Sequence, residues 1–396
     1  MAGLQAKGEL SRFLLGYETT FNTTPASPAG VILPINTCGL KAEQKLNAPA
    51  TLRGRADPAP PFYGFVDVSG DVVVPLDGAA IGFWLKGLLG QPVSTEHAPI
   101  ALNAIAVQDE TNGAIGIPLV AHGLPVGCQV TVSGSTHYNG TFTVGSQTTA
   151  NLLVLLAAYS TGGFQAETFS SGASLQPLLY THVFTVQGTL PSCYAEKGFT
   201  DISQFEVFNG LKVGKMATSL GGDKELEATF SLVGGNSLPL AATSIETSPL
   251  SVALARFSFN QGFIYQNGAM LATVTECSQT IDRQLDNSVY PIGNNAMRGA
   301  IPEGVMQISG TLKAMFEDAS LLNLGVNQTV TDIKLVYQRV IESMTIEYQE
   351  VNMSRTSPPI DTPKGLFASM DYQAFYNTGS FNSAVKITLV NQLSGY

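Results

Sequence analysis

Residues that commonly carry out chemistry are few in this chain, and their spacing does not suit catalysis. The run Gly214-Lys215-Met216-Ala217-Thr218 lacks the upstream glycine of a phosphate-binding loop and has no Ser or Thr directly after the lysine. No GxSxG elbow or GxGxxG fingerprint is present. No HExxH or HxH arrangement exists among the four histidines, which are His97, His122, His137 and His182. We therefore expect no metal site and no cofactor.

Two carboxylate pairs are spaced so that each projects from one face of an expected strand. These are Glu225/Glu227 at i, i+2 and Asp67/Asp71 at i, i+4. A glycosidase uses two facing carboxylates, but a chain with a single Trp has little with which to stack a sugar. The pairs predict a solvated acidic face, and we expect that the protein is not an enzyme.

The elements that carry these carboxylates are amphipathic strands. Polar and apolar residues alternate over 66–74 and again over 305–315, which predicts strands with one face on a core and the other toward water or a lumen. The polar positions, which are our candidates for a lumen face, are Asp67, Ser69, Asp71, Gln307, Ser309, Thr311 and Lys313. From alternation alone, the same residues could equally face outward.

The two strands belong to a segment that occurs twice. Residues 64–72 return as 304–312, an offset of 240, and residues 35–38 return as 274–277. Arg53-Gly54 likewise returns as Arg298-Gly299. Residues 230–233 match 387–390 at an offset of only 157, so the first copy holds about 83 residues that the second lacks.

The extra residues coincide with a segment of different composition. Residues 93–177 are rich in Gly, Ser, Thr and Ala and contain no Lys or Arg, and Asn139-Gly140 predicts a hairpin between alternating runs. We therefore predict a mainly β chain of two tandem sandwich- or barrel-like domains, each with a short helix, plus an inserted small all-β domain. The predicted parts are an arm at 1–30, domain one at 31–92 and 178–240, the insert at 93–177, and domain two at 241–396.

Two helices and one further turn are predicted within the copies. Ile81, Trp84, Leu85 and Leu88 have helical spacing after Asp77, which can cap the helix, and a weaker pattern occupies 316–324. Asn209-Gly210 predicts a hairpin tip.

Composition restricts the partners. Charged residues make up only 13% of the 396 residues, so we expect an oligomer that buries neutral surface. The net charge of −10 argues against gripping the phosphates of nucleic acid. No apolar run reaches the length of a membrane span, so we expect no membrane insertion. We expect the four cysteines, Cys38, Cys128, Cys193 and Cys277, to be free thiols.

Several colinear motifs resemble a known family. Residues 16–23 (GYETTFNT), 66–77 (VDVSGDVVVPLD), 85–90 (LKGLLG) and 180–184 (YTHVF) are similar to the tail tube, or major tail, proteins of bacteriophages with long non-contractile tails (siphophages). The chain departs at Asn22, where the family would have Gly. The insert resembles small β-domains that decorate phage virion proteins.

The resemblance implies a structural virion protein that forms stacked rings whose inner strands close into a β-barrel for genome ejection. Simple members form hexameric rings, so two copies per chain imply a homotrimeric ring with pseudo-sixfold symmetry. It implies contacts with a tape measure protein and with tail terminator and tip proteins, passage of DNA without specific binding, and assembly in the host cytoplasm. Two other interpretations stay open: a β-sandwich adhesin that binds the host surface, and a tail terminator or baseplate protein that forms one ring.

Overall fold

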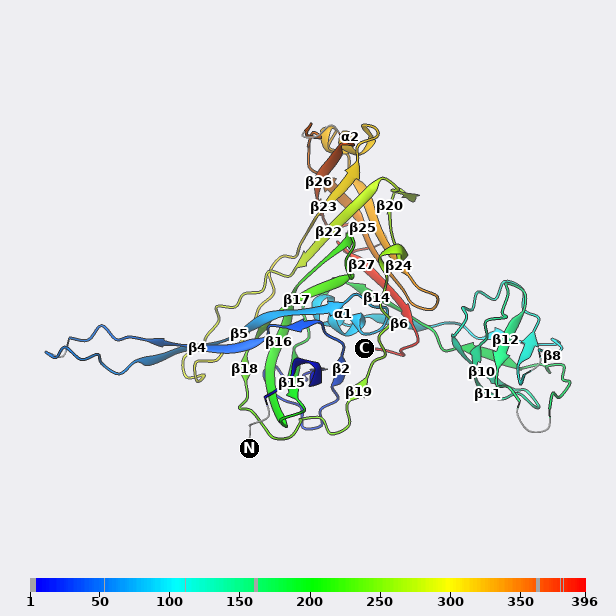
Figure 1. The fold of residues 1–396 in the computed structure, drawn as a ribbon, viewed down its shortest axis with the longest axis horizontal. Coiled ribbons are helices and arrows are strands. Elements are labelled where there is room, and N and C mark those ends of the chain that lie inside the picture. Colours follow the sequence, from blue (N-terminus) through cyan, green and yellow to red (C-terminus); the bar gives the residue numbers. More distant parts are fainter. Residues whose placement is uncertain are drawn as a thin grey trace. The chain divides into compact units, whose positions relative to one another are not determined.

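The computed structural model describes residues 5–52, 54–110, 112–159, 163–360, 364–377, 379 and 381–396. The described chain is mainly β and has two α-helices, α1 (Ile81–Leu89) and α2 (Ser320–Val326), which confirms the predicted fold class (Figure 1). It divides into two compact units. The first comprises Met1–Gln91, Phe184–Leu335 and Glu347–Lys386, and the second comprises Pro92–Val183, Val336–Ile346 and Ile387–Tyr396.

A long antiparallel sheet, which we call the central sheet, organises the first unit. Its strands, in the order of their pairing, are β4 (Lys41–Asn47) with β3 (Thr37–Cys38), β5 (Phe62–Pro75), β17 (Glu227–Gly234), β16 (Gln204–Gly221), β22 (Val274–Asp282), β23 (Gln307–Met315), β26 (Phe367–Ala374) and the end of β25 (Ser343–Met353). The β4–β5 hairpin extends beyond the rest of the sheet (Figure 1). Strand β16 of the first copy pairs directly with β22 of the second, so one sheet runs through both copies.

Alternation along each strand gives the central sheet one apolar face. A row of directly opposed residues crosses it on this face: Val72, Phe230, Met216, Ile281 and Ile308, all buried. Burial of such side chains contributes about 1.5–3 kcal/mol each. The register is therefore strongly specified, because a slip of one residue would turn the whole row toward water.

The duplication has the same strand neighbours in both copies. Cys38 opposes Val72 as Cys277 opposes Leu312, and Val72 opposes Phe230 as Leu312 opposes Met370. By pairing, the counterpart of β17 is therefore β26, and residue 370 lies 140 positions after residue 230. The match of 230–233 to 387–390 at an offset of 157 is thus wrong, because two strands of similar apolar pattern follow β25 and only β26 pairs with β23.

Strands on the other side of the core complete each copy. In the first copy these are β1 (Ser11–Tyr17), β2 (Val31–Leu33), β15 (Cys193–Phe199), β18 (Asn236–Ser237) and β19 (Leu250–Ser251). In the second they are β20 (Gly262–Gln266), β21 (Ala269–Met270) and β24 (Thr331–Gln338). Short 3₁₀ turns, η1 (Gly8–Leu10) and η2 (Phe259–Gln261), precede β1 and β20. The core of the first copy centres on Trp84 of α1, whose ring stacks with Phe13 and Phe230.

Asn209-Gly210 is not a hairpin tip, because β16 continues through it. Gly210 has φ of +63°, and the pairing with β15 shifts register between Cys193 and Ala195, so the two residues form an irregularity within the strand. The Glu18 carboxylate accepts a hydrogen bond from the Gly210 N–H at 2.7 Å, so this N–H group has a partner at the irregularity.

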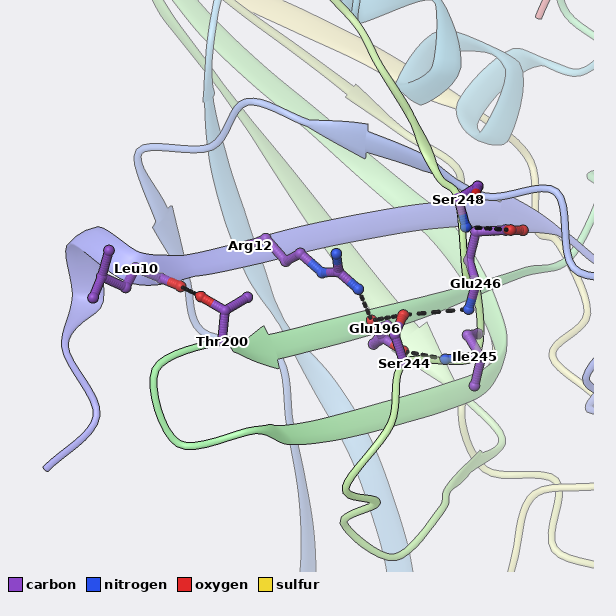
Figure 2. Close-up of polar contacts among 8 residues, drawn as sticks. All are labelled: Leu10, Arg12, Glu196, Thr200, Ser244, Ile245, Glu246 and Ser248. Carbon is purple, nitrogen blue, oxygen red and sulfur yellow. Dashed lines mark hydrogen bonds and ion pairs between the residues drawn. The ribbon is translucent and has the colours of Figure 1, made fainter. Parts of the chain in front are cut away.

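A buried carboxylate ties the segment between the copies to the first copy (Figure 2). Glu196 on β15 is fully buried. Its carboxylate oxygens accept hydrogen bonds from Arg12 Nη2 at 3.3 Å, from Ser244 Oγ at 2.8 Å and from the Ile245 N–H at 2.8 Å. A buried charge is tolerated when it is paired and hydrogen-bonded in this way.

The second unit contains a seven-stranded sheet in the order β7 (Ile100–Ala101), β13 (Ser174–Pro177), β10 (Gln129–Ser133), β11 (Gly140–Val144), β12 (Leu153–Leu156), β9 (Ile115–Ile117) and β8 (Gln108–Asp109). A short antiparallel pair, β6 (Val93–Glu96) with β14 (Tyr180–Thr185), leads into and out of it. Its apolar core also contacts Ile341 and Val390, the latter on β27 (Lys386–Asn391).

Candidate functional site

The face of the central sheet opposite its apolar core is polar, and it is the candidate functional surface. We call it the polar face, and its rows of opposed residues run across the strands. One row is Asp71, Ser231, Lys215, Asp282 and Gln307; the next contains Thr229, Thr280, Ser309 and Gln373; the third contains Ser219, Ser278, Thr311 and Asp371; the fourth contains Glu276, Lys313 and Ser369. Side chains from both copies therefore share one continuous surface.

Five of the seven candidate residues lie in these four rows. Asp71 of the first copy and Gln307 of the second stand at the two ends of one row, four strands apart, or roughly 19 Å at the usual strand spacing. Ser309, Thr311 and Lys313 follow on β23. The sequence could not show this relation, because it depends on the pairing of β16 with β22.

Contacts among the polar side chains partly neutralise the second copy's share of this face. Lys313 Nζ lies 2.7 Å from Glu276 Oε1, and Thr311 Oγ1 donates to Asp371 Oδ1 at 2.8 Å. These groups are exposed, so each pair contributes little stability and is screened by salt. Their main effect is on the potential of the surface.

Asp67 and Ser69 lie beyond these rows, where β5 pairs with β4. Ser69 opposes Lys41, and Asp67 opposes Glu43. Asp67 accepts from the guanidinium of Arg298, a residue only 2% exposed that also donates to the Val68 and Gly234 carbonyl oxygens. Asp67 is therefore also a structural partner of the segment that follows β22. Arg53, the supposed repeat equivalent of Arg298, lies outside the described residues.

The charged residues of the polar face that sequence reasoning missed are Lys215, Glu276, Asp282 and Asp371. Glu227, which the sequence placed on a solvated acidic face, lies on the same side of the sheet. Around Asp371 a signal was present, because residues 368–374 alternate between apolar and polar. Around the others the alternation is interrupted, because the buried residues Gln279 on β22 and Thr218 on β16 are polar. Counting these charged residues with Asp71 and Lys313, carboxylates outnumber amines on this face. Such a surface repels a phosphate backbone.

Other classes of site find little support within the described residues. No three His, Cys, Asp or Glu side chains there are grouped to hold a metal ion. In the same residues, no helix has both the length and the apolar character needed to cross a membrane. The four cysteines are free thiols, and burial raises the pKa of Cys128 to about 11 and that of Cys277 to about 12.

A comparison with known families decides the identity. A family model described as phage tail tube protein matches residues 8–374. The chain belongs to the phage tail tube protein family. No curated protein matches it. As a tail tube protein it is a structural component of the phage tail, and its family implies self-assembly into a tube.

Proposed function

We propose that three chains close into one ring with pseudo-sixfold symmetry, and that stacked rings form the tail tube through which the genome is ejected. The observation that carries this proposal is the β16–β22 pairing, which joins the two copies edge to edge within a chain over Lys215–Gly221 and Glu276–Asp282. A ring built by repeating one such seam leaves no sheet edge open.

The two edges of the central sheet carry the counterparts of this seam. The Ser354 N–H donates to the Asp371 carbonyl at 2.8 Å, so Ser354 opposes Asp371 as Lys215 opposes Ser231, and residues 354–360 correspond to 215–221. Cys38 corresponds to Cys277, so residues 37–43 correspond to 276–282. We expect residues 354–360 of one chain to lie along residues 37–43 of the next. Pro358 and Pro359 cannot donate, so this seam has fewer hydrogen bonds than the internal one.

In this ring the polar face lines the lumen, with Asp67, Ser69, Asp71, Gln307, Ser309, Thr311 and Lys313 as candidate lining residues. Its surplus of carboxylates would let DNA pass without specific binding, while the Lys313–Glu276 pair would make the charge alternate around the ring. We further propose domains at 31–92 with 178–240 and at 241–396, the insert at 93–177, and an arm at 1–30, of which residues 1–4 lie outside the described residues.

The assigned role is structural and not catalytic. A tape measure protein would occupy the lumen before ejection, and terminator and tip proteins would bind the end rings. Assembly would take place in the host cytoplasm.

Electron cryomicroscopy of the purified, polymerised protein tests the proposal. We expect long tubes with three chains per ring and weak sixfold features from the two copies. Six chains per ring would overturn the trimer, single rings would favour a terminator, and unassembled monomers would favour an adhesin.

A further inference from the structure

The start of α1 in the first copy is covered by the segment that leads into the second copy. The Phe257 N–H donates to the Leu76 carbonyl and the Gly78 N–H to the Ala255 carbonyl, both at 2.9 Å, around an antiparallel bridge between Asp77 and Arg256. Phe257 is buried, as are Leu76 and Asp77 beneath it. The segment thus closes the first copy's core at this point.

The same place in the second copy is open. The Phe316 N–H donates to the Leu366 carbonyl as the Leu76 N–H donates to the Leu226 carbonyl, so residue 316 corresponds to 76 and residue 317 to 77. Yet Phe316 is 39% exposed, and of the α2 residues only Gly325 is buried, whereas seven of the nine residues of α1 are buried. A groove of about 260 Å³ lies here, lined by residues that include Met270, Met315, Phe316, Leu321 and Leu322.

Within the part of the chain that the structure describes, one other segment is equivalent to 255–257. The turn η2 leads directly into β20, and η1 leads directly into β1, both as three-residue 3₁₀ turns after an extended residue, Ser258 or Lys7. Counting back from these turns, Gln5 corresponds to Arg256 and Ala6 to Phe257. Gln5 is exposed and Ala6 is only partly covered.

We propose that Gln5–Lys7, the described residues that precede η1, cover the α2 groove of the neighbouring chain. The inference rests on the proposed ring, in which the first copy of each chain follows the second copy of its neighbour. The covering segment would then bind in trans at every junction between chains, as 255–257 binds in cis at the junction within a chain. The Ala6 N–H would donate to the Phe316 carbonyl as the Phe257 N–H donates to the Leu76 carbonyl, so the contact tolerates the different side chains of the two segments.

Charge and polarity at the groove suit this occupant. Glu317 and Asp318 expose carboxylates at the start of α2, and the incoming segment carries Lys7 and no acidic residue before Glu9. In the first copy, Arg256 of the covering segment makes a similar pair with Glu225, at 3.0 Å.

Cysteine cross-linking in assembled tubes tests the contact. A chain that carries both Gln5→Cys and Glu317→Cys has thiols at the positions equivalent to Arg256 and Asp77, which are directly opposed in the first copy. Opposed residues in such a bridge have Cα atoms about 4.5 Å apart, within the range of about 4.4–6.8 Å for a disulfide. We expect oxidised tubes to give covalent dimers and trimers on a non-reducing gel, and unassembled chains to give none.

The pair Glu9→Cys and Glu317→Cys is the matched control, because residue 9 lies four positions further on and should not link. If oxidised tubes of the first variant gave only the monomer band, the proposal would be overturned. Efficient cross-linking of the control variant would overturn it as well. Wild-type protein supplies a second measurement. Hydrogen exchange at Ala6 and Asp318 should slow on assembly, and unchanged exchange in intact tubes would also contradict the inference.

The two proposals fail in different ways. Tubes with three chains per ring but no interchain disulfides would support the proposed ring and contradict only the proposed contact of the covering segment. Tubes with six chains per ring would contradict the trimeric ring itself, on which the inference rests.

Discussion

Asp77 combines two roles at one position. Its Oδ1 accepts the N–H groups of Ala79 and Ile81, at 3.2 and 2.9 Å, at the start of α1, as the sequence led us to expect. It is also fully buried, and its Oδ2 has no hydrogen-bond partner among the described residues. Burial raises the pKa of Asp77 to about 6.

This shift predicts a pH dependence of stability. The pKa of an Asp in the unfolded chain is about 3.9, so the folded protein binds this proton more tightly. The protonated form stabilises the fold fully below about pH 4, and that stability is lost as the pH rises through about 6. Asp77→Asn keeps an oxygen acceptor and removes the titration. We expect its free energy of unfolding to fall less between pH 4 and 7 than that of wild type, by up to about 3 kcal/mol.

Urea unfolding of the unassembled protein at several pH values measures this effect. Asp71→Asn, which removes the same charge from the exposed polar face, serves as the control and should leave the slope nearly as in wild type. Equal slopes for wild type and Asp77→Asn would show that Asp77 does not titrate in this range.

Arg298 is the second residue whose environment makes a prediction. Its buried guanidinium bonds to Asp67 and to the carbonyl oxygens of Asn287, Val68 and Gly234. Arg298→Met would leave these acceptors without their donor, at a cost of about 3 kcal/mol in the free energy of unfolding.

The matched control is Arg55→Met, because Arg55 forms an exposed ion pair with Asp57 at 2.6 Å. We expect that change to cost less than about 1 kcal/mol. Similar losses for the two variants, measured by denaturant unfolding, would contradict the structural role of Arg298.

The two helices, α1 and α2, occupy equivalent places in the two copies but differ in how they are packed. Trp84 and Leu88 of α1 are fully buried, whereas α2 has the groove beside it. The difference follows from coverage as well as from the helices' own sequences, because residues 255–257 cover only α1.

Leucine truncation should reveal this asymmetry. Leu88→Ala is expected to cost the unassembled protein about 3 kcal/mol, since it leaves a cavity in a closed core. Leu322→Ala, in the partly open α2, should cost less than about 1 kcal/mol. Thermal or urea unfolding distinguishes the two, and equal costs would mean that α2 is as well packed as α1 before assembly.

The central sheet and the seven-stranded sheet, which we call the module, belong to different compact units. The β6–β14 pair leads into the module, and its last hydrogen bond runs from the His97 N–H to the Leu179 carbonyl at 2.9 Å. A cut just beyond this hydrogen bond keeps the β6–β14 pair whole.

Replacing residues 98–178 with Asn-Gly should close β6 and β14 as a hairpin and leave polymerisation intact. Electron microscopy of the deletion variant is the measurement. A cut at 93–177 is the comparison, because it also removes β6 and leaves Tyr180–Val183 without that partner; we expect a lower yield of tubes. Loss of polymerisation with the first variant would mean that the module takes part in assembly.

The features that depend on near neighbours in the chain could be predicted from the amino-acid sequence. Period-two alternation placed Asp71 and Thr311 on the polar side of strands, helical spacing located α1, and self-similarity revealed two copies. These signals are local, because a strand or helix repeats every few residues and its apolar side must face a core.

The pairing of the strands could not be predicted in this way and is seen in the folded chain. The tertiary structure paired β16 with β22 and made one polar face from two copies, identified β26 as the counterpart of β17, and carried β16 straight through Asn209-Gly210. It also brought Arg298 to Asp67 and covered Asp77 with the segment between the copies. Strand pairing and burial join segments far apart in the chain, and several strands of similar apolar pattern compete for each partner. The choice among them is therefore made by packing of the whole sheet.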